Sequence, residues 1–116
     1  MKTIGIVGSR RRNSMEDYSL CEKEFLKHYE NGDKIVSGGC PQGGDRFAEV
    51  IAMLHDIDII IHYAKWDLGR HAGFLRNTDI ARDADILIAV VAKDRTGGTE
   101  DTIKKAEKMG KKIILI

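Results

Sequence analysis

The sequence is poor in cysteine, proline and aromatic residues, and its charges almost cancel. Its 116 residues include two cysteines, one proline, one tryptophan and 6% aromatic residues, and 19 basic side chains against 18 acidic ones give a net charge of +1. Cys21 and Cys40 form neither a C-x-x-C pair nor a zinc-binding pattern, which favours a reducing cytoplasm over a disulfide-stapled secreted domain. The small net charge argues against a protein that coats nucleic acid or a membrane surface, but it leaves room for a local basic site.

Long hydrophobic runs and a leader-like segment are absent as well. The longest apolar runs, Ile57–Ile61 and Ile86–Ala92, are far too short to cross a bilayer. The first residues lead into charge by Arg10, which is not typical of a signal peptide. We therefore expect a cytoplasmic protein without a membrane partner. A chain of this length buries about two-thirds of its surface on folding, which predicts a single domain over residues 1–116.

Five short runs rich in β-branched residues predict strands. The runs are Thr3–Val7, Lys34–Val36, Ile57–Tyr63, Ile86–Val91 and Lys112–Ile116. They are mostly continuous rather than alternating, a pattern typical of strands that are covered on both faces of a parallel sheet. The segments between them have apolar residues three or four positions apart, as helices do. The alternation predicts a doubly wound α/β domain, a three-layer α/β/α sandwich around a five-stranded parallel sheet.

Local signals mark the ends of the predicted helices. Ser14, with Asp17 three residues later, is typical of a helix start, and Asn31-Gly32 marks the end of that helix. The third helix, roughly His71–Arg82, has the weakest periodicity, and its predicted inner face consists of Phe74, Thr78 and Ala81. Gly110 ends the last helix before the final strand.

The loops that follow the strands carry most of the candidate chemistry. Sheets of this kind bind ligands beyond the carboxyl ends of the strands, where the strand order reverses. The four loops in question are Gly8–Asn13, Ser37–Asp45, Ala64–His71 and Ala92–Asp101. They contain most of the glycines and seven of the arginine and lysine residues. Glycine lets backbone N–H groups approach an anion, and arginine offers a fork of donors to phosphate oxygens. Together the loops predict a site for a small anionic ligand.

Each loop also has a simpler interpretation. A glycine after a strand is often only part of a tight turn, and Arg10–Arg12 is compatible with a solvated run of charge. The sequence has neither G-x-G-x-x-G nor the Lys-Ser/Thr of a P-loop, so we expect neither dehydrogenase nor adenylate kinase chemistry. Trp66 fits two roles equally well, packing a loop or stacking on a base.

Nucleophilic and metal-dependent chemistry find less support. No histidine stands at a spacing that would make it a partner of Cys40, which we interpret as a bystander thiol. The four histidines form no H-x-x-x-H or H-E-x-x-H pattern, so we expect no metal and no cofactor.

Taken together and in order, the loop motifs resemble a known family over nearly the whole chain. The motifs are Gly8-Ser9-Arg10, Ser37-Gly38-Gly39, Gly43-Gly44-Asp45, Trp66, Gly69-Arg70-His71-Ala72-Gly73, Arg76-Asn77 and Gly97-Gly98-Thr99. They are similar to the YspA/YpsA-related branch of the SLOG (SMF/DprA-LOG) superfamily. The resemblance implies a Rossmann-like fold that binds nucleotides or nucleotide-derived ligands. The superfamily includes the LOG phosphoribohydrolases, which cleave the N-glycosidic bond of nucleoside 5′-monophosphates, and the DNA-processing protein DprA. LOG-like proteins are commonly dimers, which implies a homodimer here.

Our first hypothesis is a binding module, or sensor, for a small phosphorylated ligand, such as a nucleotide or an ADP-ribose-like molecule. In it, Gly8–Arg10, Ser37–Gly39 and Gly97–Thr99 cradle phosphates, and Arg10 and Arg76 neutralise their charge. The ligand-binding set expected from the resemblance also includes Gly44, Asp45, Trp66 and Asn77.

Two alternatives follow from the same resemblance. In a LOG-like phosphoribohydrolase, Arg76 takes the place of the family's helix arginine and Asp101 or Glu100 acts as the acid. The segment Thr96–Thr102 matches the LOG signature P-G-G-x-G-T-x-x-E incompletely, and Thr102 falls where that signature has its catalytic glutamate. The second alternative is a DprA-like module that interacts with DNA through Arg10–Arg12. We rank it last, because the net charge is so small.

Overall fold

The protein is described by a computed structural model that covers all residues from Met1 to Ile116. Strands and helices alternate along the chain as predicted. In order they are β1 (Thr3–Gly8), α1 (Met15–His28), β2 (Lys34–Ser37), α2 (Gly44–His55), β3 (Ile59–Ile61), the short 3₁₀ helix η1 (Trp66–Leu68), α3 (His71–Asp83), β4 (Ile86–Val90), α4 (Gly98–Lys108) and β5 (Lys112–Leu115).

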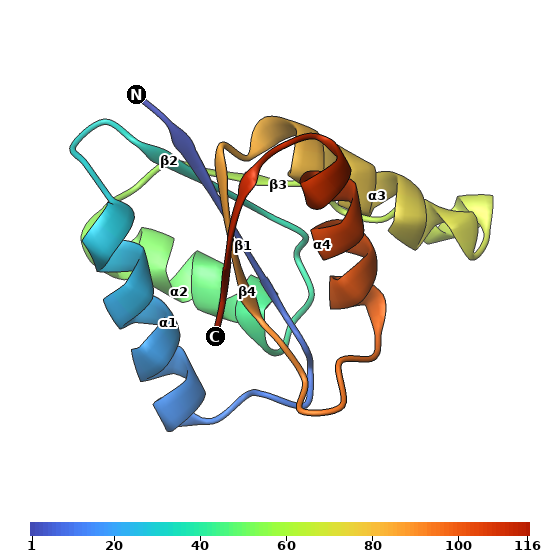
Figure 1. Ribbon diagram of the computed structural model, residues 1–116, viewed down its shortest axis with the longest axis horizontal. Coiled ribbons are helices and arrows are strands. Elements are labelled where there is room, and N and C mark those ends of the chain that lie inside the picture. The colour runs from blue at the N-terminus through green and yellow to red at the C-terminus, as the bar shows by residue number, and fades with distance from the viewer.

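The five strands form one parallel sheet in the order β3-β2-β1-β4-β5 (Figure 1). The first strand lies in the centre, so that Gly5 is paired with Val36 of β2 on one side and with Leu87 of β4 on the other. The chain moves outward from β1 to β3 and then returns to the other side of β1. This Rossmann-like arrangement confirms the predicted fold. It puts the reversal of strand order between the carboxyl ends of β1 and β4.

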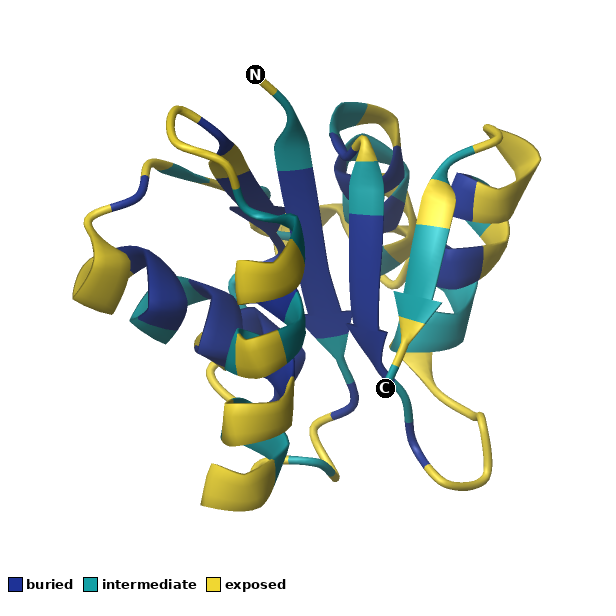
Figure 2. Cartoon of the chain, turned by 60° about the vertical axis from the view of Figure 1, so that its left-hand side comes forward, coloured by how far each residue is buried: buried dark blue, intermediate teal, exposed yellow.

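Helices cover both faces of the sheet. Helices α1 and α2 pack on one face, where Phe25 and Ile51 join Ile6 in one buried cluster, and α3 and α4 pack on the other (Figure 1). Buried residues follow the strands and the inner sides of the helices, and the outer sides of the helices are exposed (Figure 2). Burying one large aliphatic side chain contributes roughly 1.5–3 kcal/mol, so these two apolar layers hold the sandwich together. None of the helices combines the length and apolar composition that a membrane span requires.

The predicted start of the first helix is confirmed. The Ser14 hydroxyl accepts a hydrogen bond from the Asp17 N–H at 3.0 Å, and the Asp17 carboxylate accepts one from the Ser14 N–H at 3.3 Å, which makes a capping box. The strand predicted over Ile57–Tyr63 is shorter than expected. Ile57 lies in the turn that follows α2, because its N–H donates to the Ala52 carbonyl at 2.9 Å.

The predicted inner face of the third helix was wrong at Phe74. Its side chain is 53% exposed, with the Lys105 ammonium 5.5 Å from the ring centre. The buried positions of α3 include Ile80 and the polar Asn77. Asn77 can occupy an inner position because its amide is hydrogen-bonded to α4, a partner that the spacing of apolar residues does not reveal.

Carboxylates close the amino edge of the sheet. The buried Asp33 accepts hydrogen bonds from the N–H groups of Lys2 at 2.8 Å and Glu30 at 2.9 Å, and it forms an ion pair with the Lys2 ammonium at 2.6 Å. Asp85 accepts from the Thr3 N–H at 2.8 Å. Burial opposes the ionisation of Asp33, but the hydrogen bonds from Lys2 and Glu30 outweigh it and lower the pKa of this carboxyl. The chain therefore satisfies the first amides of β1 with its own acidic groups.

Candidate functional site

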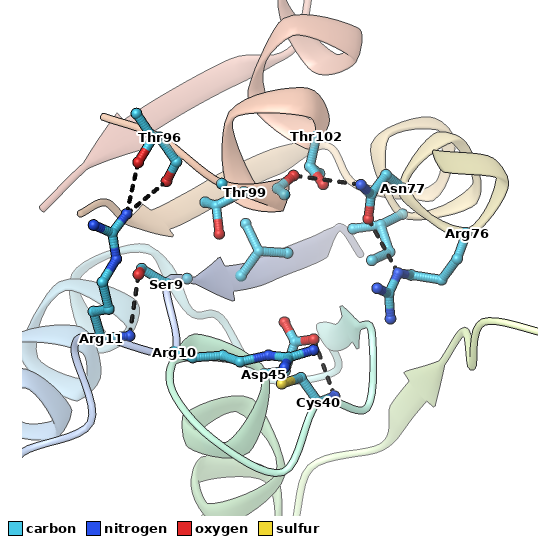
Figure 3. A pocket seen from close by; sticks show the side chains of 15 residues that line it. Ser9, Arg10, Arg11, Cys40, Asp45, Arg76, Asn77, Thr96, Thr99 and Thr102 are labelled. Atoms are coloured by element: carbon cyan, nitrogen blue, oxygen red, sulfur yellow. Dashed lines mark hydrogen bonds between the residues drawn. The ribbon is translucent and has the colours of Figure 1, made fainter. Parts of the chain in front are cut away.

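A polar cavity opens at the opposite, carboxyl edge of the sheet, beside the ends of β1 and β4 (Figure 3). Its volume is about 410 Å³, and three of its 15 lining residues are hydrophobic. The lining consists of Val7, Gly8, Ser9, Arg10, Arg11, Cys40, Asp45, Arg76, Asn77, Ile80, Thr96, Gly97, Gly98, Thr99 and Thr102. This is the position at which doubly wound sheets bind ligands.

Most of the residues that the sequence predicts for ligand binding lie in this lining. They are Gly8, Ser9, Arg10, Asp45, Arg76, Asn77, Gly97, Gly98 and Thr99. Ser37, Gly38, Gly39, Gly44 and Trp66 are outside it. The sequence analysis did not single out Val7, Arg11, Cys40, Ile80, Thr96 or Thr102 as cavity residues. Thr102 was open to prediction, because it lies four residues after Gly98 and so on the same side of the helix.

The loop after β1 supplies the cavity with one free arginine. The Ser9 N–H donates to the Val90 carbonyl at 2.9 Å, which holds this loop against the end of β4. Arg11 reaches across to the loop after β4, where its guanidinium contacts Asp94 at 2.9 Å and the Thr96 hydroxyl at 2.9 Å. The Arg10 side chain is exposed and forms neither a hydrogen bond nor an ion pair with the protein. Of these two arginines, Arg10 is therefore the one free to neutralise a ligand.

The three consecutive arginines do not act as one solvated run of charge. Arg12 forms an ion pair with Asp17 at 2.9 Å and donates to the carbonyls of Val91 at 3.2 Å and Ile116 at 2.5 Å. This guanidinium fastens the start of α1 to β4 and to the last residue. The interpretation of Arg10–Arg12 as a charge run is thus corrected: two of the three side chains are engaged by the protein itself.

Two glycines after β2, Gly43 and Gly44, allow the backbone to pack closely next to the cavity. A Cβ on Gly44 would lie 2.3 Å from the carbonyl carbon of Val7, and one on Gly43 would lie 2.3 Å from the Ser9 oxygen. Gly43 also has a φ of +74°, which favours glycine. Both residues let the start of α2 pack directly against the end of β1. Their main role is packing, and they bring the neighbouring Asp45 to the cavity wall.

Asp45 is a buried carboxyl in the wall of an otherwise cationic cavity. One of its oxygens accepts from the Cys40 N–H at 3.1 Å, and the other lies 3.1 Å from the Ser37 hydroxyl. The same Ser37 hydroxyl lies 2.5 Å from the Ile6 carbonyl oxygen. Burial raises the pKa of Asp45, although the charge of the nearby Arg76 works in the opposite direction.

Helix α3 presents Arg76 and Asn77 to the cavity. The Arg76 guanidinium donates to the Gly38 carbonyl at 2.6 Å and to the Asn77 side-chain oxygen at 3.0 Å. Arginine carries five N–H donors, so these two bonds leave further donors free for a ligand. The Asn77 amide donates to Asp101 at 3.1 Å and to the Gly98 carbonyl at 3.4 Å. Asn77 therefore orients Arg76 on one side and joins α3 to α4 on the other.

The start of α4 faces the cavity with unused donors. The N–H groups of Gly98 and Thr99 have no acceptor in the protein, as expected for the first turn of a helix without a side-chain cap. Thr102 is 1% exposed and lines the cavity, and no hydrogen bond joins its hydroxyl to another protein atom. No fully buried side-chain oxygen or nitrogen lacks a partner, so this hydroxyl opens onto the cavity. A helix start favours negative charge. The amides and the hydroxyl thus form a concave set of hydrogen-bond donors.

Trp66 lies away from the cavity. It belongs to η1, its side chain is 60% exposed, and its ring packs near Gly73, where a Cβ would lie 3.1 Å from the ring. The indole contacts its own loop and the start of α3, and it is not part of the lining of the polar cavity.

The two candidate acids, Glu100 and Asp101, also lie outside the cavity lining. Both Glu100 oxygens accept from Arg95 at 2.9 Å. Asp101 accepts from Asn77 at 3.1 Å and from the Lys105 ammonium at 2.7 Å. Each carboxylate is thus occupied by partners on α3, on α4 or in the loop before α4.

The donor set suits an anion better than a metal ion. Arg10, part of Arg76, the first amides of α4 and the Thr102 hydroxyl are all donors, and Asp45 is the one carboxyl in the lining. No group of three or more histidine, cysteine, aspartate or glutamate side chains is placed to hold a metal ion. Hydrogen-bond donors around a partly enclosed, cationic space match phosphate chemistry.

Comparison with solved structures supports the fold. The chain is similar to the X-ray structure of TM1055, a target of the Northeast Structural Genomics Consortium, with a TM-score of 0.68 and 16% sequence identity. The similarity covers 97% of this chain and 72% of that chain. No model of a protein family and no curated protein matches the sequence. At this identity the similarity concerns the fold alone, and it agrees with the Rossmann-like architecture described above.

Proposed function

We propose that this protein binds a small phosphorylated ligand, a nucleotide or an ADP-ribose-like molecule, in the cavity at the carboxyl edge of the sheet. The observation that carries the proposal is the set of unused donors at the start of α4. The amides of Gly98 and Thr99 and the hydroxyl of Thr102 converge where Arg10 and Arg76 have spare guanidinium donors. A phosphoryl group satisfies all of them at once, because its oxygens accept several hydrogen bonds and its charge suits the helix start.

The resemblance to the YspA/YpsA-related branch of the SLOG superfamily supports the same proposal. Three of its motifs, Gly8-Ser9-Arg10, Arg76-Asn77 and Gly97-Gly98-Thr99, line this cavity, and a doubly wound sheet binds nucleotides at this edge. A sensor role and a homodimer stay predictions of that resemblance. We do not extend the proposal to DNA, because Arg11 and Arg12 are bonded within the protein.

The phosphoribohydrolase alternative gains no specific support from the geometry. Hydrolysis of an N-glycosidic bond requires a carboxylate close to the ribose. Thr102 stands where the LOG signature has glutamate, and Glu100 and Asp101 are bonded to other residues outside the lining. We therefore propose binding rather than turnover.

Thermal unfolding in the presence of ADP, ADP-ribose and adenosine tests this proposal. A ligand at a hundredfold excess over its Kd stabilises by about 2.7 kcal/mol, which raises the Tm of a domain of this size by on the order of 10 °C. We expect the two phosphorylated compounds to raise the Tm and adenosine to leave it unchanged. Equal shifts with all three compounds, or no shift with any, would contradict the proposal. Chromatography of the incubated ligands separates binding from turnover, since release of free base would indicate hydrolysis.

The variant Thr102→Val separates ligand binding from folding. Valine keeps the shape of the side chain and removes the hydroxyl, which has no partner in the protein. We expect an unchanged or higher Tm without ligand and a smaller shift with ADP. Thr78→Val on the outer side of α3 is the control, because Thr78 donates to the Phe74 carbonyl and does not line the cavity.

A further inference from the structure

The contacts of the Ser37 hydroxyl require one more hydrogen than this hydroxyl carries. The Ser37 hydroxyl has a single hydrogen but two oxygen neighbours, the Ile6 carbonyl at 2.5 Å and an Asp45 carboxyl oxygen at 3.1 Å. Two oxygens as close as 2.5 Å require a hydrogen between them, and a carbonyl has none to give. The Ser37 hydrogen is therefore directed at Ile6. The contact between Ser37 and Asp45 is left without a hydrogen if Asp45 is ionised.

A proton on Asp45 resolves this count. A neutral carboxyl donates to the Ser37 oxygen, and its other oxygen still accepts from the Cys40 N–H at 3.1 Å. We propose that Asp45 holds a proton as the donor to Ser37, and that this neutral carboxyl allows the cavity to take a doubly charged phosphoryl group. The second half of the proposal rests on the proposed function, whereas the first half concerns the protein alone.

The charges around Asp45 come from each element packed against it. Arg76 on α3 and the start of α2 favour the ionised carboxyl, whereas burial and Glu49 on α2 oppose ionisation. Arg10 from the loop after β1 and the Cys40 thiol lie in the same cavity wall (Figure 3). Arg76 acts through its charge only, because its guanidinium donates to the Gly38 carbonyl instead. Burial prevails, and the pKa of Asp45 is raised.

The chemical consequence is a cavity whose charge depends on pH. With Asp45 neutral, the lining carries the guanidinium groups without an opposing buried charge. With Asp45 ionised, a carboxylate lies in the wall that a phosphoryl group approaches, and the two repel each other. When a dianion binds, Asp45 therefore takes up a proton more readily, and the affinity of the cavity for the dianion falls as the pH rises.

Carbon-13 NMR of the side-chain carboxyl groups tests the proton without any ligand. The Asp45 carboxyl resonance is assigned through its correlations with the backbone atoms of the same residue, and we expect its midpoint above the ordinary aspartate value of about 3.9. Asp94 is the internal control, because Arg11 and Thr96 lower its pKa to about 2. A midpoint for Asp45 at or below the ordinary value would overturn the proposal.

The variant Ser37→Ala gives a second, independent result. If Asp45 donates to Ser37, removal of the hydroxyl takes away a partner of the neutral acid, and the midpoint of Asp45 falls. If Ser37 donates to an ionised Asp45, the same change raises the midpoint. The sign of the shift thus decides who donates, and a rise would refute our assignment even if Asp45→Asn failed to fold.

Sulfate is the probe for the second half, because it stays doubly charged from pH 5 to pH 8 and no histidine lines the cavity. The measurement is made by calorimetry on a Cys40→Ser background, which removes the thiol from the cavity wall. We expect the sulfate affinity to fall with pH above the Asp45 midpoint, by up to about tenfold per pH unit. Asp45→Asn should bind as tightly as the parent at low pH and show no such fall. Asp79→Asn, which lies outside the lining and pairs with Arg82, should keep the fall.

The possible outcomes separate the two proposals. Two results would overturn the role of Asp45 in anion binding. One is a sulfate affinity of the parent that does not change with pH, and the other is a pH dependence that stays the same in Asp45→Asn. Absence of sulfate binding at every pH would refute the anion cavity itself and with it the second half of the inference. The carbon titration would still decide whether Asp45 holds the proton.

Discussion

At the amino edge of the sheet, carboxylates of the protein accept hydrogen bonds from backbone amides, whereas at the carboxyl edge backbone amides have no acceptor in the protein. Asp33 accepts from the N–H of Lys2, just before β1, and Asp85 accepts from the N–H of Thr3, the first residue of β1. Across the sheet, Gly98 and Thr99 at the start of α4 have amides that no acceptor meets. The two edges use the same chemistry, an amide facing a negative charge, and differ in whether the protein supplies that charge. The comparison indicates which edge stabilises the fold and which is available to a ligand.

The largest effect is expected from Gly44, the first residue of α2. Gly44→Ala would place a methyl group 2.3 Å from the Val7 carbonyl carbon, against backbone that cannot move aside. We expect a loss of more than about 3 kcal/mol in unfolding free energy, measured by urea denaturation. Gly98→Ala is the matched control, since nothing lies within 4 Å of its Cβ. Similar losses in both variants would contradict this difference between α2 and α4.

At the amino edge, Asp33→Ala should cost about 2–3 kcal/mol of unfolding free energy, because two buried hydrogen bonds to a charged acceptor are lost. The pKa of Asp33 is lowered in the folded state, so its contribution is present above the ordinary aspartate pKa of about 3.9 and is lost as pH falls through the folded-state value. The stability gap to the wild type should therefore narrow in acid. We expect the affinity for ADP to be the same as in the wild type. A weaker affinity in Asp33→Ala would contradict the proposal that the amino edge stabilises the fold and the carboxyl edge binds the ligand.

At the carboxyl edge, Arg76→Ala should weaken ADP binding by tenfold or more, equivalent to about 1.4 kcal/mol, because a charge-assisted bond to phosphate is lost. Calorimetry measures the affinity directly. Arg82→Ala, on the same helix, removes an exposed arginine that pairs with Asp79 and should leave the affinity unchanged. Equal losses in the two variants would show that net charge, and not the cavity, determines binding.

Arg10→Ala should have the smallest effect, roughly a twofold to fivefold loss of ADP affinity, because an exposed cation contributes only about 0.2–1 kcal/mol. Its Tm without ligand should equal that of the wild type, since this side chain has no partner in the protein. Lys93→Ala removes the same charge from an exposed position in the loop after β4 and serves as the control. An affinity that depends equally on Lys93 would indicate diffuse attraction rather than a contact.

The strand pattern was predictable because each β-branched run is local in sequence and the central strands β1 and β4 are buried on both faces. The glycine and arginine loops pointed to the edge at which the polar cavity lies, since the alternation of elements fixes where strands end. The partners of the arginines were not predictable: Arg11 contacts Asp94 across 83 positions, and Arg12 contacts Ile116 across 104. For the same reason the sequence did not reveal that Asn77, 24 positions away, binds Asp101. The pairing of Glu100 with Arg95 and of Asp101 with Lys105 is local in sequence, and the helical spacing of Asp101 and Lys105 could have suggested the second pair.

The central place of β1 has a consequence for the order of folding. Its two neighbours in the sheet lie at different distances along the chain. Strand β2 follows β1 after one helix, but β4 begins only at residue 86. Contacts between segments so distant in the chain form slowly. The cavity draws on both halves, from Ser9 to Thr102, so it exists only after β4 has docked. A folding intermediate made of the first half would have a partial sheet but no ligand site, and a ligand can favour only the last stage of assembly.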